Sequence, residues 1–245
     1  MTHIALVTGG SRGIGRATCL ALAANGAAVA VHYHARAEAA AEVVAAITQA
    51  GGCAVAVQAD VRDSAAISSM IEQVSAELGA VDILVNNAGE MTDSSVEAMS
   101  DDQWDDALAL NLSSAFRCAR SSLPAMRAQG WGRIVNVASQ VIFTGSVNHA
   151  HYAAAKSGLL GLTFSLAKEV SASGVTVNLV SPGRIVTDMI IDKIAQREQE
   201  WLAQTPMRRL GQPEEVASVI AFLASDAASY VTGANLNVNG GLVMG

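Results

Sequence analysis

Short runs of β-branched and aliphatic residues alternate along this chain with longer alanine-rich stretches. Almost every residue within a run is apolar, unlike the in–out alternation of a half-exposed strand. Such runs are typical of parallel strands that helices cover on both faces. The predicted strands are residues 3–8, 28–33, 53–57, 82–85, 133–138, 175–180 and 235–238, and the predicted helices are 13–24, 37–50, 65–78, 102–126 (with a break near Pro124), 152–171 and 213–224.

Strands and helices that alternate at this spacing build right-handed β-α-β units. The chain is therefore predicted to be an α/β protein with a doubly wound, Rossmann-type parallel sheet of about seven strands and helices on both faces. No linker, repeat or low-complexity segment divides the sequence, and a length of 245 residues suits one large domain. Residues 1–245 are thus expected to form a single domain.

Composition excludes several classes of protein. Hydrophobic residues make up 51% of the chain and charged residues 15%, which excludes a disordered chain. The formal net charge of −7 argues against a nucleic-acid partner. Three scattered cysteines, with no CxxC, predict neither disulfides nor a metal site. No signal peptide and no apolar run of about 18 residues is found, so we expect no membrane partner and a cytoplasmic location.

One segment interrupts the rhythm of strands and helices. Residues 184–209 follow the sixth predicted strand, are more polar than their surroundings and include the stretch IIDKIAQREQEWLAQ. We interpret this segment as a substrate lid over the site. The alternative interpretation is an ordinary amphipathic helix on the surface.

A glycine-rich turn joins the first predicted strand to the first predicted helix. It reads TGGSRGIG from Thr8 to Gly15. Glycines allow a tight turn and a close approach of the backbone to a phosphate, and the helix N-terminus offers free N–H groups. The turn lies where dinucleotide-binding sheets hold their phosphates. A P-loop is excluded because no GK[ST] sequence follows.

The spacing of this turn is TGxxxGxG, and further motifs follow it in order. These motifs are Asp60-Val61, Asn86-Asn87-Ala88-Gly89, Asn111, Ser139, Tyr152-x-x-x-Lys156, Pro182-Gly183, Ile185 and Thr187. With them the sequence resembles the short-chain dehydrogenase/reductase family over its whole length, and within that family it resembles the 3-oxoacyl-(acyl carrier protein) reductases. The family is usually tetrameric, so the resemblance implies a homotetramer.

The resemblance implies a nicotinamide dinucleotide site at the carboxyl ends of the strands. The pair Asp60-Val61 would border the adenine and Asn87-Ala88 the ribose region, although Asn86 to Gly89 could also form a plain turn. Ile185 and Thr187 would contact the nicotinamide. The implied cofactor-binding residues are Gly9, Ser11, Arg12, Gly13, Ile14, Gly15, Asp60, Val61, Asn87, Ala88, Tyr152, Lys156, Ile185 and Thr187.

Reduction of a carbonyl group needs a proton donor, and Tyr152 is the candidate. The pKa of a phenol, about 10, is too high for efficient transfer at neutral pH. Lys156 lies four residues later on the same helical face, and its positive charge would lower that pKa. Ser139, at the end of the fifth predicted strand, can donate a hydrogen bond to the substrate oxygen. The resemblance implies that Asn111 helps to hold a water that relays protons through the lysine.

Each of these residues also has an ordinary structural interpretation. Ser139 could simply cap a strand end, and Asn111 could bond locally within its helix. Their joint occurrence in the family's order favours the catalytic interpretation. His149 and His151 stand where the similar reductases usually have Gln and Asn. Either one of them contacts the substrate or both only shape the loop, and they form no metal site because no third ligand is apparent.

The end of the second predicted strand bears on the choice of cofactor. NAD-binding sheets usually place an acidic residue there, but this chain has Tyr33 and no carboxylate before Glu38. Arg12 in the turn and Arg36 just past the strand suit a 2′-phosphate, so Arg36 joins the cofactor-binding residues and NADP(H) is favoured over NAD(H). The alternative is that Arg36 faces solvent and that cofactor use is mixed.

The sequence thus predicts an NADP(H)-dependent oxidoreductase that interconverts a secondary alcohol and a ketone, either 3-oxoacyl-like or another small carbonyl. The alternative is a strict 3-oxoacyl-(acyl carrier protein) reductase of fatty acid synthesis. The resemblance implies that basic residues for an acidic carrier should fall near Gly130 and Ser173. Neither position is basic, so Arg127, Arg133 or Lys168 would have to compensate. A non-catalytic nicotinamide sensor would lack some of the catalytic residues, and a sugar-nucleotide epimerase would need a further domain.

Overall fold

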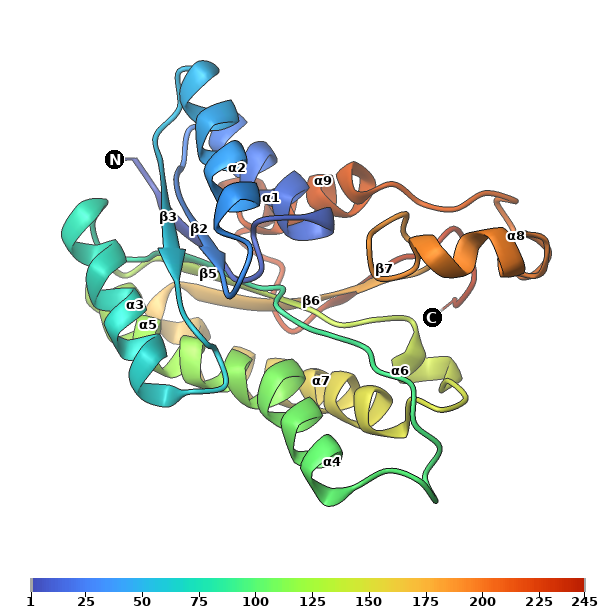
Figure 1. The fold of residues 1–245 in the computed structure, drawn as a ribbon. Helices are drawn as coiled ribbons and strands as arrows, with labels where there is room; N and C mark the ends of the chain where they lie inside the picture. Colours follow the sequence, from blue (N-terminus) through green and yellow to red (C-terminus); the bar gives the residue numbers. More distant parts are fainter. Residues whose placement is uncertain (1, 245) are drawn as a thin grey trace.

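The computed structural model of this protein describes residues 2–244. Seven strands form one sheet, with helices packed against both of its faces (Figure 1). The elements are β1 (Ile4–Val7), α1 (Gly13–Ala24), β2 (Ala28–Tyr33), α2 (Ala37–Gln49), β3 (Ala54–Gln58), α3 (Ser64–Glu77), β4 (Ile83–Asn86), α4 (Asp101–Leu108), η1 (Ala109–Ser113), α5 (Ser114–Gln129), β5 (Gly132–Val137), α6 (Val141–Thr144), α7 (Ala150–Val170), η2 (Ser171–Ser173), β6 (Val175–Pro182), α8 (Ile191–Gln204), α9 (Pro213–Leu223), η3 (Asp226–Ala228) and β7 (Asn235–Val238).

The strands pair in parallel in the order β3-β2-β1-β4-β5-β6-β7. The chain winds outward from β1 to β3 and then crosses back to place β4 on the other side of β1. Ligands of open α/β sheets bind where the winding reverses, at the carboxyl ends of the strands. This arrangement confirms the predicted doubly wound parallel sheet and places its switch point between β1 and β4.

The core consists of two layers, one on each face of the sheet. Successive side chains of a strand point to opposite faces, so Leu6 packs into one layer and Val7 into the other. Helices α3, α5 and α7 cover the first face, and α1, α2 and α9 cover the second (Figure 1). Both faces of the inner strands are therefore buried, which explains their unbroken apolar runs, whereas the edge strands β3 and β7 are only partly buried. Among residues 2–244, no helix is long and apolar enough to cross a membrane.

The predicted helix 102–126 is interrupted at a different place from the one expected. Helix α5 continues through Pro124, whereas the break lies earlier, in the π-helical segment η1 around Asn111. The Asn111 side chain donates a hydrogen bond from Nδ2 to Ala107 O at 3.1 Å, and Ser114 Oγ donates to Leu110 O. Side chains that bond to backbone carbonyls compete with the regular helical pattern, and π segments occur often at functional sites.

Helix α8 lies within the segment 184–209 and stands beyond the carboxyl edge of the sheet (Figure 1). Trp201 is its one buried residue, and the Arg184 side chain donates a hydrogen bond to the carbonyl of Trp201 at 3.1 Å. A β-bridge between Ile185 and Gly211 joins the start of this segment to the residues just after it. The segment thus contains an amphipathic helix, placed where a lid was expected.

Candidate active site

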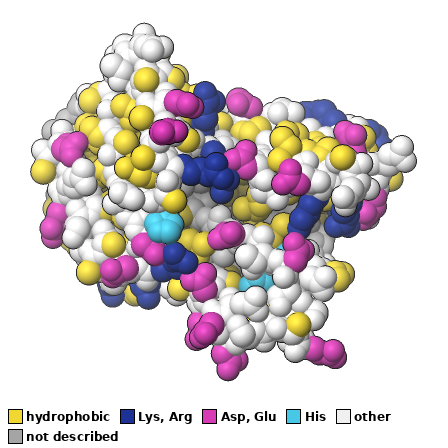
Figure 2. Space-filling view, in the orientation of Figure 1, with side chains coloured by type: hydrophobic (Ala, Val, Ile, Leu, Met, Phe, Trp, Pro, Cys, Tyr) yellow, Lys and Arg dark blue, Asp and Glu magenta, His cyan; other side chains and the backbone are white. Residues whose placement is uncertain are grey.

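A cleft of about 1000 Å³ runs along the carboxyl ends of the strands. Figure 2 shows the surface hollowed between the part that carries α1 and α2 and the part that carries α8. Every predicted cofactor-binding residue lines this cleft, from Gly9 in the first turn to Thr187 before α8. Ser139, Tyr152 and Lys156 line it too, whereas Asn111 lies outside its wall. Its size suits a cofactor-sized ligand.

The glycine-rich turn between β1 and α1 is tightly packed and forms a cradle of backbone groups at the start of α1. Gly9 and Gly13 have φ values of +65° and +50°, which other residues rarely adopt. A Cβ atom on Gly15 would lie only 2.1 Å from the Gly9 carbonyl oxygen. The N-cap residue Arg12 makes no side-chain cap, and the first turn of α1 holds no acidic residue. The first N–H groups of the helix are therefore available for an anion, as a dinucleotide phosphate requires.

A buried histidine on β2 holds this turn in place. The Gly9 N–H donates a hydrogen bond to His32 Nδ1 at 2.9 Å, and His32 Nε2 lies 3.1 Å from the carbonyl of Ala59. Because Nδ1 accepts, the proton of the neutral ring sits on Nε2. His32 is 2% exposed, and burial lowers its pKa to about 4. Sequence analysis missed this residue, although a histidine in an otherwise apolar strand was a signal.

Polar contacts also join the turn to the end of β4. Thr8 Oγ1 accepts hydrogen bonds from the backbone N–H groups of Asn87 and Ala88, at 2.9 and 3.0 Å. The Asn87 side chain donates to the carbonyl of Thr8 at 2.9 Å. The two strands that flank the switch point are thus held in register by Thr8, and the expected ribose region lies between them.

The candidate proton donor is buried in the wall of the cleft. Tyr152 is 6% exposed, and burial raises its pKa to about 12. A hydrogen bond with the Ser139 side chain has the opposite effect and lowers the pKa. Lys156 Nζ lies 5.8 Å from the centre of the Tyr152 ring and donates a hydrogen bond to the carbonyl of Val137 at 2.8 Å. Burial lowers the pKa of Lys156 to about 8, so much of its charge is retained at neutral pH.

Asn111 lies behind this group of residues. Its Oδ1 accepts a hydrogen bond from Glu90 N at 3.2 Å, and its Nδ2 donates to Glu90 O at 3.1 Å. A Cβ atom on Gly89 would lie 2.6 Å from Asn111 Oδ1 and 3.2 Å from Lys156 Nζ. The absence of a side chain at Gly89 is what allows Asn111 and Lys156 to approach the same point of the backbone.

The two predicted cofactor arginines differ in their surroundings. Arg12 forms an exposed ion pair with Asp188 at 3.1 Å, whereas Arg36 is exposed at the cleft wall. Tyr33, the last residue of β2, also lines the cleft. A phosphate near these arginines would have to compete with Asp188 for Arg12 but would meet Arg36 directly.

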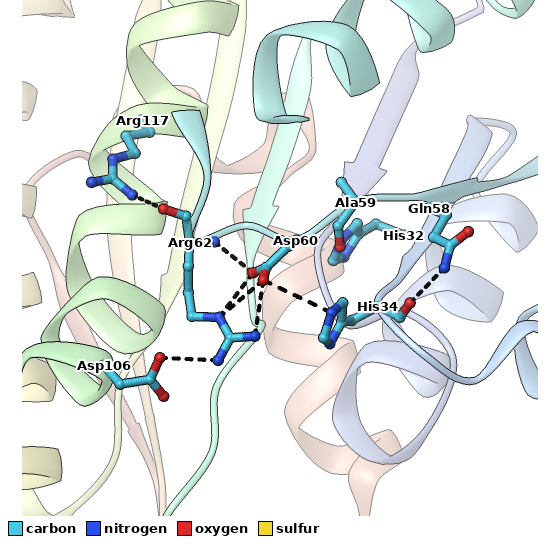
Figure 3. Close-up of polar contacts among 8 residues, drawn as sticks. All are labelled: His32, His34, Gln58, Ala59, Asp60, Arg62, Asp106 and Arg117. Carbon is cyan, nitrogen blue, oxygen red and sulfur yellow. Dashed lines mark hydrogen bonds and ion pairs between the residues drawn. The ribbon is translucent and has the colours of Figure 1, made fainter. Parts of the chain in front are cut away.

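Asp60, expected at the adenine, belongs to a network of charged side chains (Figure 3). Its carboxylate accepts hydrogen bonds from the Nε and Nη2 atoms of Arg62, each at 2.9 Å, and His34 Nε2 lies 3.9 Å away. Hydrogen bonds from Arg62 are the main reason that the pKa of Asp60 lies below its usual range. Arg62 also binds Asp106 of α4 at 2.9 Å. The expected adenine edge of the cleft is therefore braced against α4, a role of Arg62 that sequence analysis missed.

The two positions considered for docking a carrier lie at the opposite end of the sheet. Gly130 lies two residues before β5, and Ser173 lies two residues before β6, so both lie at the amino ends of the strands. Arg127 pairs with Glu169 at 3.1 Å, and the buried Arg133 pairs with Asp226 at 3.3 Å. Within one chain these positions face away from the cleft, and two of the three candidate cations already have partners.

Taken together, the switch-point cleft and its Ser–Tyr–Lys group define a dinucleotide-binding oxidoreductase. The family model described as "Enoyl-(Acyl carrier protein) reductase" matches residues 9–243. The chain belongs to the short-chain dehydrogenase/reductase family, as that match and its relatives show.

The relatives cover almost the whole chain. It is 43% identical over 244 residues to a 3-oxoacyl-(acyl-carrier-protein) reductase FabG of Staphylococcus aureus, covering 100% of this chain and 99% of the relative. The FabG proteins of Salmonella typhimurium and Escherichia coli are 47% and 46% identical over 241 residues, covering 98% of this chain and 97% of each relative. Among solved structures, a putative gluconate dehydrogenase from Agrobacterium tumefaciens matches with a TM-score of 0.95 and 33% identity, covering 99% of this chain and 97% of that one.

These names describe different reactions. An enoyl reductase adds hydride to a carbon–carbon double bond, whereas a 3-oxoacyl reductase adds it to a ketone. The relatives that match over the full length favour reduction of a ketone. The hydrogen-bonded hydroxyls of Ser139 and Tyr152 favour it too, because both can donate to a substrate oxygen. The protein is an NAD(P)-dependent oxidoreductase that acts on CH–OH and C=O groups.

Proposed function

We propose that this protein is an NADP(H)-dependent ketoreductase for a 3-oxoacyl-like or other small carbonyl compound, with Tyr152 as the proton donor. The observation that carries the proposal is the buried Tyr152, hydrogen-bonded to Ser139 and 5.8 Å from Lys156 Nζ, in the same cleft as the phosphate cradle. A shared cleft lets one ligand reach from the cradle to the tyrosine.

The cradle fits the cofactor because Gly9, Gly13 and Gly15 permit its tight turn and α1 leaves its first N–H groups free. These N–H groups, with Ser11 and Arg12, would hold the phosphates. The walls near Asp60 and Val61 would take the adenine, and those near Ile185 and Thr187 would take the nicotinamide, which supplies or accepts the hydride when bound.

In reduction, the Ser139 hydroxyl donates a hydrogen bond to the carbonyl oxygen and fixes its position. The Tyr152 hydroxyl donates its proton to the same oxygen as the alcohol forms. The positive charge of Lys156 stabilises the phenolate left behind, because an opposite charge nearby favours the ionised form. Asn111, held by Glu90 behind Lys156, would help to hold the water through which the lysine and the tyrosine recover the proton.

The preference for NADP(H) rests on the charge at the end of β2. Arg36 is exposed at the cleft wall, and Tyr33 stands where an acidic residue would repel a 2′-phosphate. The segment 184–209 would act as the substrate lid, since Ile190, Lys193 and Trp201 line the cleft. A cytoplasmic location and a homotetramer stay predictions.

A strict 3-oxoacyl-(acyl carrier protein) reductase is the second candidate. The names of the full-length relatives favour it. The uncharged residues at the two docking positions, Gly130 and Ser173, argue against it, because neither offers a positive charge to an acidic carrier.

Steady-state assays test the proposal. The purified protein is mixed with NADPH or NADH and with a small 3-keto ester, a 3-oxoacyl thioester, a carrier-linked 3-oxoacyl group or a sugar acid. We expect ketone-dependent oxidation of NADPH, with kcat/KM well above that for NADH. No ketone-dependent oxidation, or equal use of both cofactors, would contradict the corresponding part of the proposal.

A further inference from the structure

Helix α8 has one ion pair with the opposite side of the cleft. Within the described chain, Lys193 of α8 places its Nζ 2.8 Å from Oδ2 of Asp93, which lies in the loop between β4 and α4. An ion pair between Asp188 and Arg12 also crosses the cleft, at the cofactor end. Lys193 is therefore the charged contact of α8 at the substrate end.

Asp93 also approaches the start of the helix that carries Tyr152. Its Oδ1 lies 3.0 Å from Nε2 of His149, a buried residue that lines the cleft and immediately precedes α7. The other ring nitrogen of His149, Nδ1, lies 2.9 Å from the Ser146 hydroxyl. One carboxylate thus contacts both the lid helix and the residue three positions before the proton donor.

The loop that carries Asp93 is fixed on both sides of it. Thr92 Oγ1 lies 2.9 Å from Nε2 of His151, which is 1% exposed. Ser94 N donates a hydrogen bond to the carbonyl of Asn148 at 2.9 Å. Both histidines before Tyr152 therefore hold this loop, and Asp93 is presented to α8 from a fixed base.

We propose that Asp93 is a positioning residue that locks the lid helix α8 against the start of α7. We call Asp93, His149 and Lys193 the substrate-side clamp. It joins three segments that are distant in sequence and encloses the substrate end of the cleft. The inference rests on the proposed function in one respect, namely that the substrate binds at this end.

The exposure of the clamp suits a contact that opens and closes. The side chains of Lys193 and Asp93 are 36% and 58% exposed, so water screens their attraction. An exposed ion pair of this kind shifts an equilibrium by up to about fivefold. Lys193 is also the main reason that the pKa of Asp93 lies below its usual range, so the carboxylate is charged at neutral pH. The clamp therefore favours the closed lid without sealing the cleft.

Hydrogen exchange of the α8 amides tests the clamp without any turnover. A helix of 14 residues has marginal stability when it is detached from the protein, so opening of the lid exposes its amides. We expect exchange in α8 to be about threefold faster in Asp93→Asn and in Lys193→Gln than in the wild type. The double variant should be no faster than either single variant. Lys193→Arg keeps the charge and should exchange at nearly the wild-type rate.

Two references keep the measurement specific. The amides of α9 serve as an internal control, and Asp105→Asn removes an exposed aspartate of α4 that lies outside the cleft. The α9 amides should exchange at the same rate in every variant. Asp105→Asn should leave the exchange rate of α8 unchanged. Wild-type exchange in Asp93→Asn, or additive effects in the double variant, would overturn the clamp.

Kinetics separate the clamp from a purely structural role. In Asp93→Asn, KM for a small keto ester should rise about threefold while kcat stays within about twofold. In the wild type, KM should rise with salt, and this dependence should disappear in Asp93→Asn. An unchanged KM with faster exchange would show that the clamp holds the lid but not the substrate. Absence of turnover in the wild type would refute the proposed function and leave the exchange result standing.

Discussion

The two ends of the cleft are built in different ways. At the cofactor end, backbone N–H groups that follow β1 and β4 donate hydrogen bonds to buried side chains, as Gly9 does to His32 and as Asn87 and Ala88 do to Thr8. At the substrate end, the walls meet through partly exposed ion pairs such as Lys193 with Asp93. Buried hydrogen bonds are costly to break, whereas exposed ion pairs are cheap to break. The cofactor end has an exposed ion pair too, Arg12 with Asp188, but its glycine-rich turn is held by buried bonds. We therefore describe the buried frame of the cofactor end as the rigid half, and the part that α8 and Asp93 close over the substrate as the adjustable half.

Removal of the proton donor, at the boundary between the two halves, should have the largest effect. In Tyr152→Phe, kcat/KM should fall by about 1000-fold or more, because the acid is lost with little change of shape. Binding of NADPH, measured by its fluorescence, should stay within about threefold, because the cradle is untouched. The variant thus separates the chemical step from cofactor binding, which depends on the rigid half.

A matched substitution is available for this experiment. Tyr230 is fully exposed, so Tyr230→Phe makes the same chemical change away from the cleft. It should leave kcat/KM unchanged. Near-normal kcat in Tyr152→Phe would remove Tyr152 from its assigned role.

The sequence predicted the rigid half far better than the adjustable one. Its parts, from Gly9 to Asn87, are glycines and polar residues that follow strands at fixed spacing. The sequence alone indicates where the backbone must turn tightly and where polar side chains meet at the ends of strands. The helix break was expected at Pro124 because proline is the usual helix breaker, whereas an asparagine that bonds to the carbonyl four residues earlier, as Asn111 does to Ala107, does not by its sequence alone mark a π segment. The pairing of Asp93 with Lys193, 100 residues apart, has no local signal at all. Contacts between loops depend on the completed fold.

The buried His32 should make the rigid half sensitive to acid. Because burial lowers its pKa from 6.5 to about 4, the ring is neutral in both states at pH 7 and costs nothing there. Between these two pH values the unfolded chain takes up a proton that the folded chain does not. The free energy of unfolding should therefore fall by about 1.4 kcal/mol per pH unit over this window from His32 alone.

Urea titrations between pH 7 and pH 4.5 measure this loss. The comparison is His32→Gln, whose amide oxygen can still accept from the Gly9 N–H but does not titrate. The variant should lose less stability with acid than the wild type. Parallel curves for the two proteins would show that His32 does not carry the acid sensitivity.

Replacement of the two cofactor arginines should change the kinetics less than loss of Tyr152, and the two replacements should differ in their effect on KM for NADPH. Arg36→Ala should raise KM for NADPH about tenfold, because a charge-assisted bond to a phosphate is lost. Arg12→Ala should have a smaller effect, because Arg12 is shared with Asp188. Tyr33→Asp should shift the preference towards NADH by repelling a 2′-phosphate. NADH kinetics serve as the control, and an equal rise of both KM values in Arg36→Ala would contradict a contact with the 2′-phosphate.

The smallest expected effect concerns the carrier. An acidic carrier protein gains association rate from opposite charge, and that gain fades as salt rises. Gly130 and Ser173 provide no positive charge, and Arg127 and Arg133 are already paired with Glu169 and Asp226. The binding energy should therefore come mainly from the keto group and its immediate chain, within the adjustable half.

A small 3-keto thioester and its carrier-linked form should accordingly be reduced with kcat/KM values within about threefold of each other, and salt should change their ratio little. The test measures both substrates at low and at high ionic strength. A large preference for the carrier that collapses in salt would reveal a basic docking surface, and Lys168 is then the first residue to replace, because no ion pair holds it in the described chain. If Lys168→Gln removed the preference while the small thioester was unaffected, recognition would extend beyond the cleft. The division of the cleft into two halves would then need a third region, at the amino ends of the strands and away from α8.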